Sequence, residues 1–262
     1  MNSAGVIYAV SGVRYFKEVL ISVRSLARAW PGPCIVYYDR VPEELARAGR
    51  IGPGVEFKRF TASSNPFADK VHCMTNSPFE RTLFLDADTY VLDIPEDLFG
   101  LLDRFDLAAA HAPGYRSFKD PDVPSAFYEF NTGVILYRMS ERMRAFFAHW
   151  VEVLDAWNKA PPFFFYGAAG GGEAEQPAFR RCLYQTDLQV CVLGPEYNYR
   201  LPFPGALIEP VHIIHGRHND FEKVARLLNR TNGPRVFPRE IKPDLAFRIG
   251  RKIRRLLGTA PA

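Results

Sequence analysis

Hydrophobic residues in the first forty positions form two apolar runs separated by a segment with helical spacing. Gly5–Val10 is a β-rich apolar run, and Cys34–Tyr38 is a second one. Between them, apolar residues such as Val19 and Val23 recur at helical intervals until Pro31 interrupts the pattern. A strand, a helix and a strand within about 35 residues form a βαβ unit, which predicts a parallel sheet with its ligand-binding edge at the strand carboxyl ends.

The hydrophobic pattern predicts further elements along the chain. One short helix and three strands are predicted at Pro42–Ala48, Val55–Phe60, Leu107–Ala110 and Val134–Tyr137. Ser140 can cap a longer helix that runs to about Asn158. The apolar residues of this helix share one face, which predicts core packing and no chemistry: Met143, Phe146, Phe147, Trp150, Leu154 and Trp157.

The stretch Arg81–Asp93 contains a strand-like run that ends in two carboxylates. The apolar run Leu83–Leu85 precedes Asp86 and Asp88, and a second apolar run follows them. A D-x-D sequence alone is weak evidence, because paired acids are common at solvated strand ends and turns. Its place directly after a buried strand brings two hard oxygen ligands to the ligand-binding edge of the sheet. The position therefore favours a metal-binding pair.

Small and polar residues at the ends of the first two strands share that edge. Ala9, Ser11 and Gly12 lie at the end of the first strand, and Asp39 ends the second. No G-x-G-x-x-G follows the first strand, so a dinucleotide-binding loop is not predicted. A tight turn between strand and helix is enough to explain Ser11 and Gly12 on their own.

Composition is that of an ordinary globular protein. The chain has 262 residues, 47% hydrophobic and 24% charged, which is enough for a large core in one α/β domain. No apolar run reaches about 18 residues and the N-terminus lacks signal-peptide features, so we expect a cytoplasmic protein. The cysteines are widely spaced without a C-x-x-C pair, which predicts buried thiols and neither a zinc site nor a disulfide framework: Cys34, Cys73, Cys182 and Cys191.

The formal net charge of +4 is unevenly distributed. From Arg235 to the end, eight Lys and Arg stand against two Asp and Glu, a net of +6, so residues 1–234 carry −2. We expect one folded domain over residues 1–234 and a basic tail over 235–262, with an amphipathic helix at Leu245–Leu257. This helix could pack on the domain as a solvated element or bind the inner face of an anionic membrane peripherally. No nucleic-acid recognition motif accompanies it, so no nucleic-acid partner is expected.

Five segments, in this order, resemble one enzyme family. They are Lys70 with the D-A-D stretch, then FNTGVILYR (Phe130–Arg138), EQPAF (Glu175–Phe179), YNYR (Tyr197–Arg200) and HIIHG (His212–Gly216). Together they resemble the nucleotide-sugar-dependent glycosyltransferases of the GT-A fold, family 8, especially the glycogenin and lipopolysaccharide galactosyltransferase group. The resemblance covers roughly residues 5–218, and its strength lies in the order of the motifs.

The resemblance implies a fold and a metal site. The fold is α/β, the Rossmann-like GT-A nucleotide-diphospho-sugar transferase fold, with a mixed, mostly parallel sheet flanked by helices. Asp86 and Asp88 would bind Mn²⁺, or Mg²⁺, together with one histidine of HIIHG. Strand alternation places His212 and His215 on opposite faces, so only one should face the carboxylates. We prefer His215, at the strand end, and keep His212 as the second candidate.

The resemblance also assigns donor-binding residues. Lys70 would face the nucleotide-sugar and Asn131 the donor sugar, although an Asn in N-T-G is more often a turn former. Glu175 and Gln176 would face the sugar, with Gln176 nearest to a residue under the anomeric carbon, although either could simply cap the helix they open. The two residues are therefore our catalytic candidates together with Asp88.

Three residues at the strand ends and one basic residue complete the predicted donor site. Ala9, Ser11 and Asp39 would hold the nucleoside. The family's usual K-P-W after the histidine is absent, and Arg217-His218-Asn219 stands there instead. Arg217 is therefore predicted to neutralise phosphate charge in its place.

The predicted activity is transfer of a hexose from a UDP-sugar, or a related nucleotide-sugar, to a hydroxyl of a glycan, lipid-linked or cell-envelope acceptor. Retention of anomeric configuration and a role in polysaccharide biosynthesis follow from the resemblance alone. The aromatic and glycine-rich stretch Pro161–Gly172 is either a disordered connector or an acceptor-side flap. The alternatives are a sugar-nucleotide nucleotidyltransferase and a non-catalytic nucleotide-sugar or glycan-binding protein of the same fold.

Overall fold

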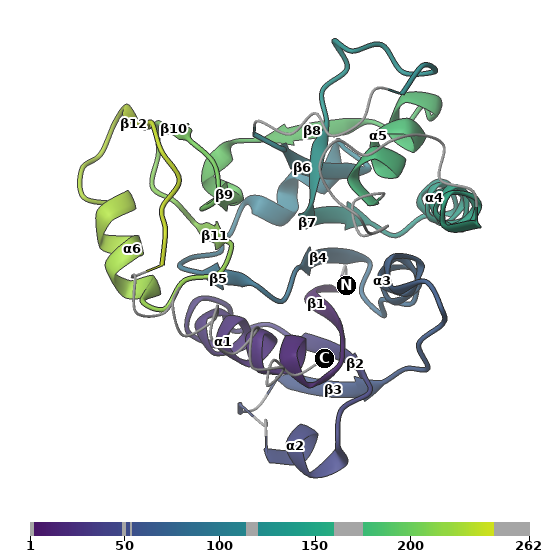
Figure 1. Cartoon of the computed structure of the whole chain (residues 1–262), viewed down its shortest axis with the longest axis horizontal. Coiled ribbons are helices and arrows are strands. Elements are labelled where there is room, and N and C mark those ends of the chain that lie inside the picture. Colours follow the sequence, from purple (N-terminus) through teal and green to yellow (C-terminus); the bar gives the residue numbers. More distant parts are fainter. Residues whose placement is uncertain (1–2, 49–50, 53, 114–119, 160–174, 244–262) are drawn as a thin grey trace, which may run out of the picture.

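A seven-stranded sheet forms the centre of the protein. The structure is a computed structural model that describes residues 3–48, 51–52, 54–113, 120–159 and 175–243. In spatial order the strands are β3 (Val55–Arg59), β2 (Cys34–Asp39), β1 (Ala4–Ser11), β4 (Arg81–Leu85), β7 (Phe130–Arg138), β6 (Leu107–His111) and β8 (Val190–Leu193). Figure 1 shows the sheet between its helices.

One strand of this sheet runs against the others. β7 pairs antiparallel with both β4 and β6, and every other neighbouring pair is parallel. The sheet is therefore mixed and mostly parallel, as predicted. Because β7 is reversed, its first residues lie at the same edge as the carboxyl ends of β4 and β6.

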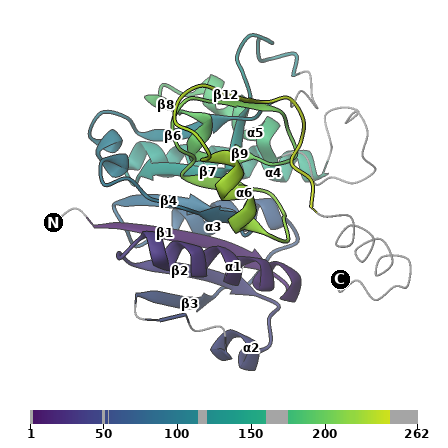
Figure 2. The ribbon, with the colours of Figure 1, turned by 90° about the vertical axis from the view of Figure 1, so that its left-hand side faces the viewer.

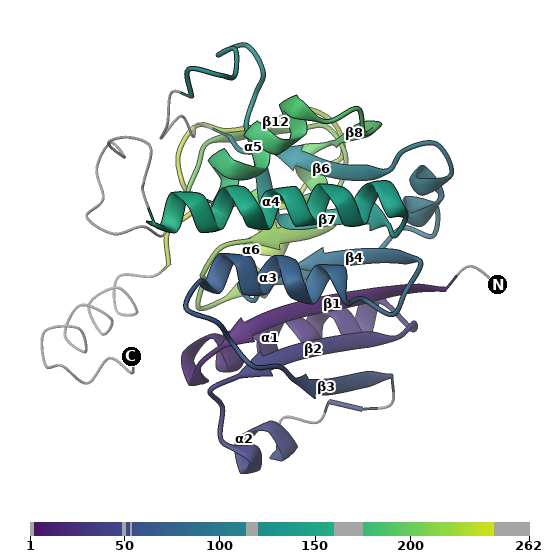
Figure 3. The ribbon, with the colours of Figure 1, turned by 90° about the vertical axis from the view of Figure 1, so that its right-hand side faces the viewer.

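Helices cover both faces of the sheet. α1 (Val13–Ala29) packs on one face (Figure 2), and α3 (Pro66–Thr75), α4 (Glu141–Lys159) and α5 (Glu175–Gln185) pack on the other (Figure 3). The short helix α2 (Glu43–Ala48) follows β2. Each face has its own hydrophobic cluster, so the alternate residues of β1 and β4 are buried on both sides.

The turn between β1 and α1 is tight and requires glycine. Gly12 has a φ of 88°, a conformation that side chains disfavour, and its N–H donates to the carbonyl of Asp39 at 2.8 Å. The simpler prediction for Ser11 and Gly12, a tight turn, is therefore confirmed. The hydrogen bond fixes the end of β2 beside the end of β1.

The long helix α4 follows its sequence pattern. The hydroxyl of Ser140 accepts from the N–H of Met143 at 3.1 Å, which is an N-terminal cap. All six apolar residues of the predicted stripe are buried, with the Trp150 side chain fully inaccessible. The prediction of core packing is confirmed.

A second, smaller group of elements adjoins the sheet edge. β5 (Thr89–Val91), β11 (Ile213–His215) and β9 (Tyr199–Arg200) form a three-stranded sheet, and β10 (Gly205–Leu207) pairs with β12 (Arg235–Phe237). Among the described residues, the remaining elements are α6 (Phe221–Leu228) and the 3₁₀ helices Leu98–Asp103 and Pro195–Tyr197. The antiparallel pairing of β11 with β5 brings the end of β11 beside the turn that follows β4.

The last described residues belong to the predicted tail and pair with the folded domain. β12 falls within it and is paired with β10, and the N–H of Ile241 donates to the carbonyl of Leu201 at 2.8 Å. The predicted helix Leu245–Leu257 and the predicted flap Pro161–Gly172 lie outside the described residues. Among the described helices, none is long and apolar enough to cross a membrane.

Two details differ from the sequence predictions. The strand predicted at Val134–Tyr137 begins at Phe130, so Asn131 and Thr132 lie inside β7 and Asn131 is not a turn former. The reason is pairing, because Phe130 lies opposite His111 of β6 and Gly133 accepts from the N–H of Asp86. All four cysteines are free thiols, with three buried and Cys191 only partly buried.

Candidate active site

The D-A-D turn lies where β4, β7 and β11 meet. Asp86 follows β4 directly, and its N–H donates to the carbonyl of Gly133 in β7 at 2.8 Å. The N–H of Gly216, just after β11, donates to the carbonyl of Asp88 at 2.9 Å. The turn is thus held by backbone bonds to both neighbouring strands, which fixes the directions of the two carboxylates.

A buried series of hydrogen-bonded hydroxyl groups connects β1 and α1 to this turn. Tyr8 in β1 contacts Ser22 of α1 at 2.9 Å, and Ser22 contacts Thr89 at 2.8 Å. The Thr89 hydroxyl then donates to the carbonyl of Asp86 at 2.8 Å. Helix α1 therefore contributes polar residues to a buried network that preorganises the carboxylate turn.

Asp86, Asp88 and His215 form a compact ligand cluster. One ligand atom from each residue can be chosen so that all three lie within 4.8 Å of one another. Nε2 of His215 is 3.3 Å from Oδ1 of Asp88 and 3.7 Å from Oδ2 of Asp86. Burial alone would raise the pKa of Asp88, but His215 and Arg217 outweigh it and hold that pKa well below its usual value.

The other candidate histidine is elsewhere. Nδ1 of His212 lies 3.4 Å from Oδ2 of Asp93, and its ring stacks on Tyr197 with centroids 4.7 Å apart. The structure therefore brings His215, and not His212, to the carboxylates. His212 precedes β11 and His215 is its last residue, so the two side chains have different surroundings.

Gly133 makes the close approach of the cluster possible. A Cβ at this position would lie 2.0 Å from Cε1 of His215 and 2.6 Å from Oδ2 of Asp86. The glycine is in the middle of β7, where its missing side chain leaves the space that two metal-ligand candidates use. The glycine of F-N-T-G thus has a physical role in the site.

A chain of amide hydrogen bonds fixes the ring of His215. The N–H of Gly133 can only donate, so the Asn131 atom it meets at 3.1 Å is Oδ1. The Asn198 amide donates to the same oxygen at 2.7 Å, which leaves Oδ1 of Asn198 facing Nδ1 of His215 at 2.8 Å. Nδ1 of His215 therefore carries a proton, and Nε2 is the ring nitrogen that faces Asp86 and Asp88.

The amide hydrogen bonds continue from Asn131 away from Asp86, Asp88 and His215. With Oδ1 of Asn131 assigned, its Nδ2 is the donor to Oε1 of Gln176 at the start of α5. Nε2 of Gln176 then donates to Oε1 of Glu129 at 3.1 Å. Asn131 and Gln176, both predicted to face the sugar, are therefore hydrogen-bonded to each other through their side chains.

Lys70 and Glu175 form a buried ion pair under the site. Nζ of Lys70 lies 2.9 Å from Oδ1 of Asp86, 2.5 Å from Oε1 of Glu175 and 2.9 Å from the carbonyl of Thr132. The lysine is 8% exposed. Burial lowers its pKa, but the two carboxylates outweigh this effect and raise it overall. The cation of Lys70 is thus committed to Asp86 and Glu175.

Arg217 is held on the other side of the cluster. Its guanidinium makes paired hydrogen bonds to both carboxylate oxygens of Glu18 in α1, at 2.8 to 3.0 Å. Nη1 of Arg217 lies 3.2 Å from Oδ2 of Asp88. The fork of Glu18 therefore aims a fixed positive charge at the second carboxylate of the D-A-D turn.

These residues line a pocket of about 330 Å³ at the sheet edge. The lining consists of Asp86, Asp88, Ala112, Pro113, Asn131, Thr132, Glu175, Gln176, Arg200, Phe203, His215 and Arg217. Its polar groups converge from β4, β7, α5 and β11, which is the usual character of a small-molecule site. Lys70 lies behind this lining and reaches it through Asp86 and Glu175.

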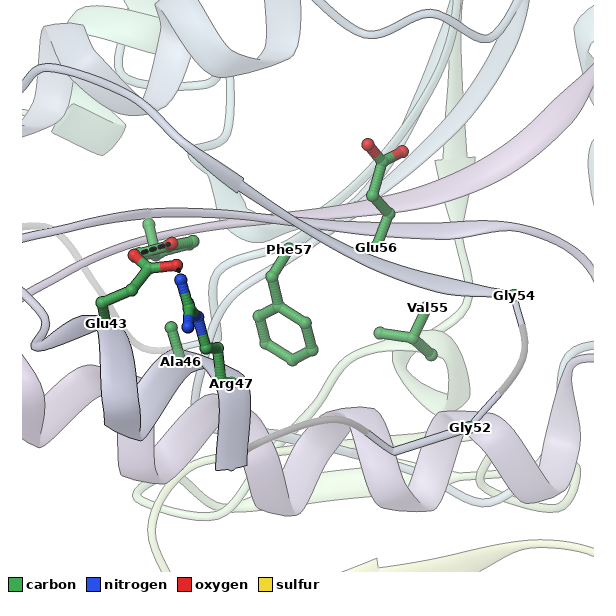
Figure 4. Close-up of a pocket in the computed structure, with 9 residues that line it drawn as sticks. Glu43, Ala46, Arg47, Gly52, Gly54, Val55, Glu56 and Phe57 are labelled. Carbon is green, nitrogen blue, oxygen red and sulfur yellow. Dashed lines mark hydrogen bonds and ion pairs between the residues drawn. The ribbon is translucent and has the colours of Figure 1, made fainter.

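Two further pockets are present among the described residues. One of about 690 Å³ shares Pro113 and Arg200 with the first and is lined mainly by apolar atoms. Another, of about 450 Å³, lies between α2 and the edge strand β3 (Figure 4). In the latter, Glu43 pairs with Arg47 at 3.4 Å and accepts from the Tyr38 hydroxyl at 3.3 Å, so these three side chains contact one another.

Three predicted residues are outside the pocket. Ser11 and Asp39 are register partners at the carboxyl ends of β1 and β2, and Ala9 is two positions earlier in β1. Oδ2 of Asp39 lies 3.3 Å from Nε of Arg40. The three residues share the predicted edge, but they do not line the pocket around the D-A-D turn. Their nucleoside-binding role stays a prediction.

Several residues of the site had no separate role in the sequence prediction. Asn198 belongs to the Y-N motif, so a signal for it was present. Glu129 precedes F-N-T-G, and Glu18 lies on the helix α1, without any local pattern that marks either one. Both are recognised only through the side chains they contact in the folded protein.

Comparison with solved structures identifies the fold. The glycosyltransferase GlyE of Streptococcus pneumoniae aligns with a TM-score of 0.58 and 18% identity, over 88% of this chain and 58% of that one. An active-site mutant of LgtC, in which glutamate replaces a glutamine, aligns with a TM-score of 0.55 and 16% identity, over 86% and 96%. The chain has the GT-A fold. At these identities the likeness concerns the fold alone.

Sequence comparison agrees with the resemblance over a limited segment. Human glycogenin-1 is 39% identical over 71 residues, which is 27% of this chain and 16% of glycogenin-1. Human glycogenin-2 is 38% identical over 71 residues, or 11% of its length. The match thus spans less than a fifth of these relatives. No protein-family model matches the chain. The GT-A fold expected from the resemblance is confirmed, and the partial glycogenin match is consistent with its family 8-like part.

Proposed function

We propose that the protein is a metal-dependent glycosyltransferase that moves a hexose from a UDP-sugar, or a related nucleotide-sugar, to an acceptor hydroxyl. The observation that carries the proposal is the convergence of Asp86, Asp88 and Nε2 of His215 at a polar pocket of a GT-A fold. The partial match to glycogenin and the likeness to the galactosyltransferase LgtC, solved with donor and acceptor sugar analogs, support the same class.

The chemistry of the donor set fits a divalent cation. Two carboxylates and an imidazole nitrogen converge, and the ring proton lies on the far nitrogen of His215, bonded to Asn198. A divalent cation that displaces a proton from Nε2 would be held by this nitrogen and by the two carboxylates. Oxygen and nitrogen ligands of this kind suit Mn²⁺, with Mg²⁺ as the alternative. When bound, the metal would bind the pyrophosphate and neutralise charge on the departing nucleotide diphosphate.

The residues around the cluster have separate tasks in this proposal. Arg217, oriented by Glu18, supplies a second positive charge for the diphosphate. Lys70 holds Asp86 and Glu175 in place from below. Asn131 and Gln176 present their amides to the donor sugar, and Gln176 lies nearest to the anomeric carbon. LgtC has a glutamine at its active site, which is replaced by glutamate in a solved mutant, and this supports a glutamine in such a role here. We infer retention of configuration from the family resemblance alone.

We propose that the acceptor hydroxyl approaches the donor sugar from a second pocket next to the donor pocket. The larger, mainly apolar pocket shares Pro113 and Arg200 with the donor pocket and offers room for it. A glycan, lipid-linked or cell-envelope acceptor is consistent with this position. The proposed place of action is the cytoplasmic side of such an envelope.

Calorimetry followed by a hydrolysis assay tests the class of activity. We expect UDP to bind with a Kd that improves at least about tenfold when Mn²⁺ is added, because a cation held by Asp86 and Asp88 would neutralise charge on the diphosphate. UDP-hexose should then be hydrolysed slowly or transferred. Heat without turnover would indicate a binding protein of this fold, and pyrophosphate-dependent formation of UDP-sugar would indicate a nucleotidyltransferase. Either result would reject the proposal.

A further inference from the structure

Glu129 lies behind the pocket at the end of the amide chain. It precedes β7 and is 5% exposed, and its backbone carbonyl accepts from the N–H of Ala112 at 2.9 Å. It does not line the donor pocket. A buried carboxylate is costly unless its oxygens have partners, and Oε1 accepts from Nε2 of Gln176 at 3.1 Å. This contact links a buried acid to a residue of the proposed sugar site.

The order of donors and acceptors along these amide hydrogen bonds allows the Gln176 side chain only one orientation. Asn131 offers only its Nδ2 to Gln176, because its Oδ1 already accepts from Gly133 and Asn198. Gln176 must therefore turn Oε1 to Asn131 and Nε2 to Glu129. An acceptor at Glu129 completes this arrangement. Without one, the partly buried Nε2 would lose its partner, and the amide would be free to rotate away.

We propose that Glu129 is a positioning residue for sugar transfer, because its carboxylate fixes the amide of Gln176 against Asn131 at the donor-sugar face of the pocket. The inference rests on the proposed function for its catalytic consequence, but the hydrogen-bond geometry stands without it. His215 is held independently of Glu129, since Gly133 and Asn198 already determine its tautomer. The metal cluster should therefore not depend on Glu129.

The ionisation of Glu129 gives a specific signature. Burial raises the pKa of Glu129 from its ordinary 4.5 to about 7, and Gln176 and Arg180 lower it in part. Among the described residues, the charged and titratable side chains that face it are Arg180 of α5, which also binds the carbonyls of Phe127 and Pro124, and His111 of β6. Above about pH 7 the carboxylate accepts strongly from Gln176. Below it the protonated acid is a weaker acceptor, and its own O–H competes as a donor.

Two substitutions separate the acceptor from the charge. Glu129→Gln keeps an acceptor oxygen and removes the titration, whereas Glu129→Leu removes both. We expect the Leu variant to lose about 10- to 100-fold in kcat for UDP-hexose turnover, with the donor KM and the Kd for Mn²⁺ within about twofold. The Gln variant should recover most of kcat and lose the part of the pH profile that rises through about pH 7. Glu152→Gln, at a side chain 76% exposed on α4, is the matched control.

An NMR measurement that needs no turnover tests the hydrogen bond between Glu129 and Gln176. In the wild-type protein, the ¹⁵N side-chain amide signal of Gln176 should shift with pH and a midpoint near 7, and this titration should vanish in Glu129→Gln. A Gln176 signal that ignores both pH from 5 to 8.5 and the substitution would overturn the proposal. So would a Glu129→Leu variant with wild-type kcat. Absence of all turnover in the wild type would instead reject the proposed function and leave the amide titration to decide this inference.

Discussion

Replacing Asp88 by alanine is expected to abolish metal-dependent turnover of nucleotide-sugars, with a loss of about a thousandfold or more. Asp88 supplies one of three ligand atoms in the cluster, and Nη1 of Arg217 lies 3.2 Å from its other oxygen. Its low pKa keeps it ionised throughout the neutral range. Removal therefore takes both a ligand and the negative charge that opposes Arg217. Initial rates of UDP release in Mn²⁺, with circular dichroism to check folding, measure the effect.

A nearby acid serves as the control for this variant. Asp93 lies five positions further along, its side chain is 61% exposed, and it pairs with His212 and not with the cluster. Asp93→Ala should retain turnover within about twofold, because exposed pairs of this kind contribute little. Undiminished turnover in Asp88→Ala would exclude a metal role for this residue.

The second large effect is expected from Gly133→Ala. The added Cβ would fall 2.0 Å from Cε1 of His215 and 2.6 Å from Oδ2 of Asp86, distances that force both ligands to move. The ring of His215 cannot simply rotate, because Asn198 holds Nδ1. We expect Mn²⁺ affinity to fall about 100-fold or more, with turnover falling in parallel. Titration of Mn²⁺ by electron paramagnetic resonance measures the affinity directly.

Gly100 provides a matched glycine for comparison. Apart from its chain neighbours and the backbone of its own helix, no atom lies within 4 Å of a Cβ built there, and its φ is outside the region that favours glycine. Gly100→Ala should leave Mn²⁺ affinity unchanged. Equal affinities in Gly133→Ala and the wild type would contradict the close approach of His215 and Asp86 that defines the site.

Much of the fold could be predicted from hydrophobic periodicity. The first βαβ unit is predicted because β1 and β2 are apolar runs that separate clearly from the amphipathic α1. The reversal of β7 could not be predicted, because a buried strand has the same composition in either direction. That reversal is what brings Asn131 to the edge where Asp86 lies. Local pattern alone therefore read Asn131 as a turn residue.

The site was predictable where a ligand type follows a strand end. Asp86, Asp88 and His215 meet as expected, since each ends or follows a strand that reaches the same edge. Lys70 and Glu175 were predicted in the same region, but their mutual ion pair depends on α3 and α5 both packing against α4. Glu18 and Glu129 could not be predicted, because their roles depend on a single partner far along the chain: Arg217 and Gln176.

Release of UDP from UDP-hexoses by the wild-type chain, with Mn²⁺ and then with a chelator, tests the central claim most directly. GDP- and dTDP-sugars measured in parallel identify the nucleotide. We expect release from at least one UDP-sugar that stops when the metal is chelated and returns when Mn²⁺ is restored. No release from any of these donors with Mn²⁺ or Mg²⁺, or release that the chelator leaves unchanged, would contradict it.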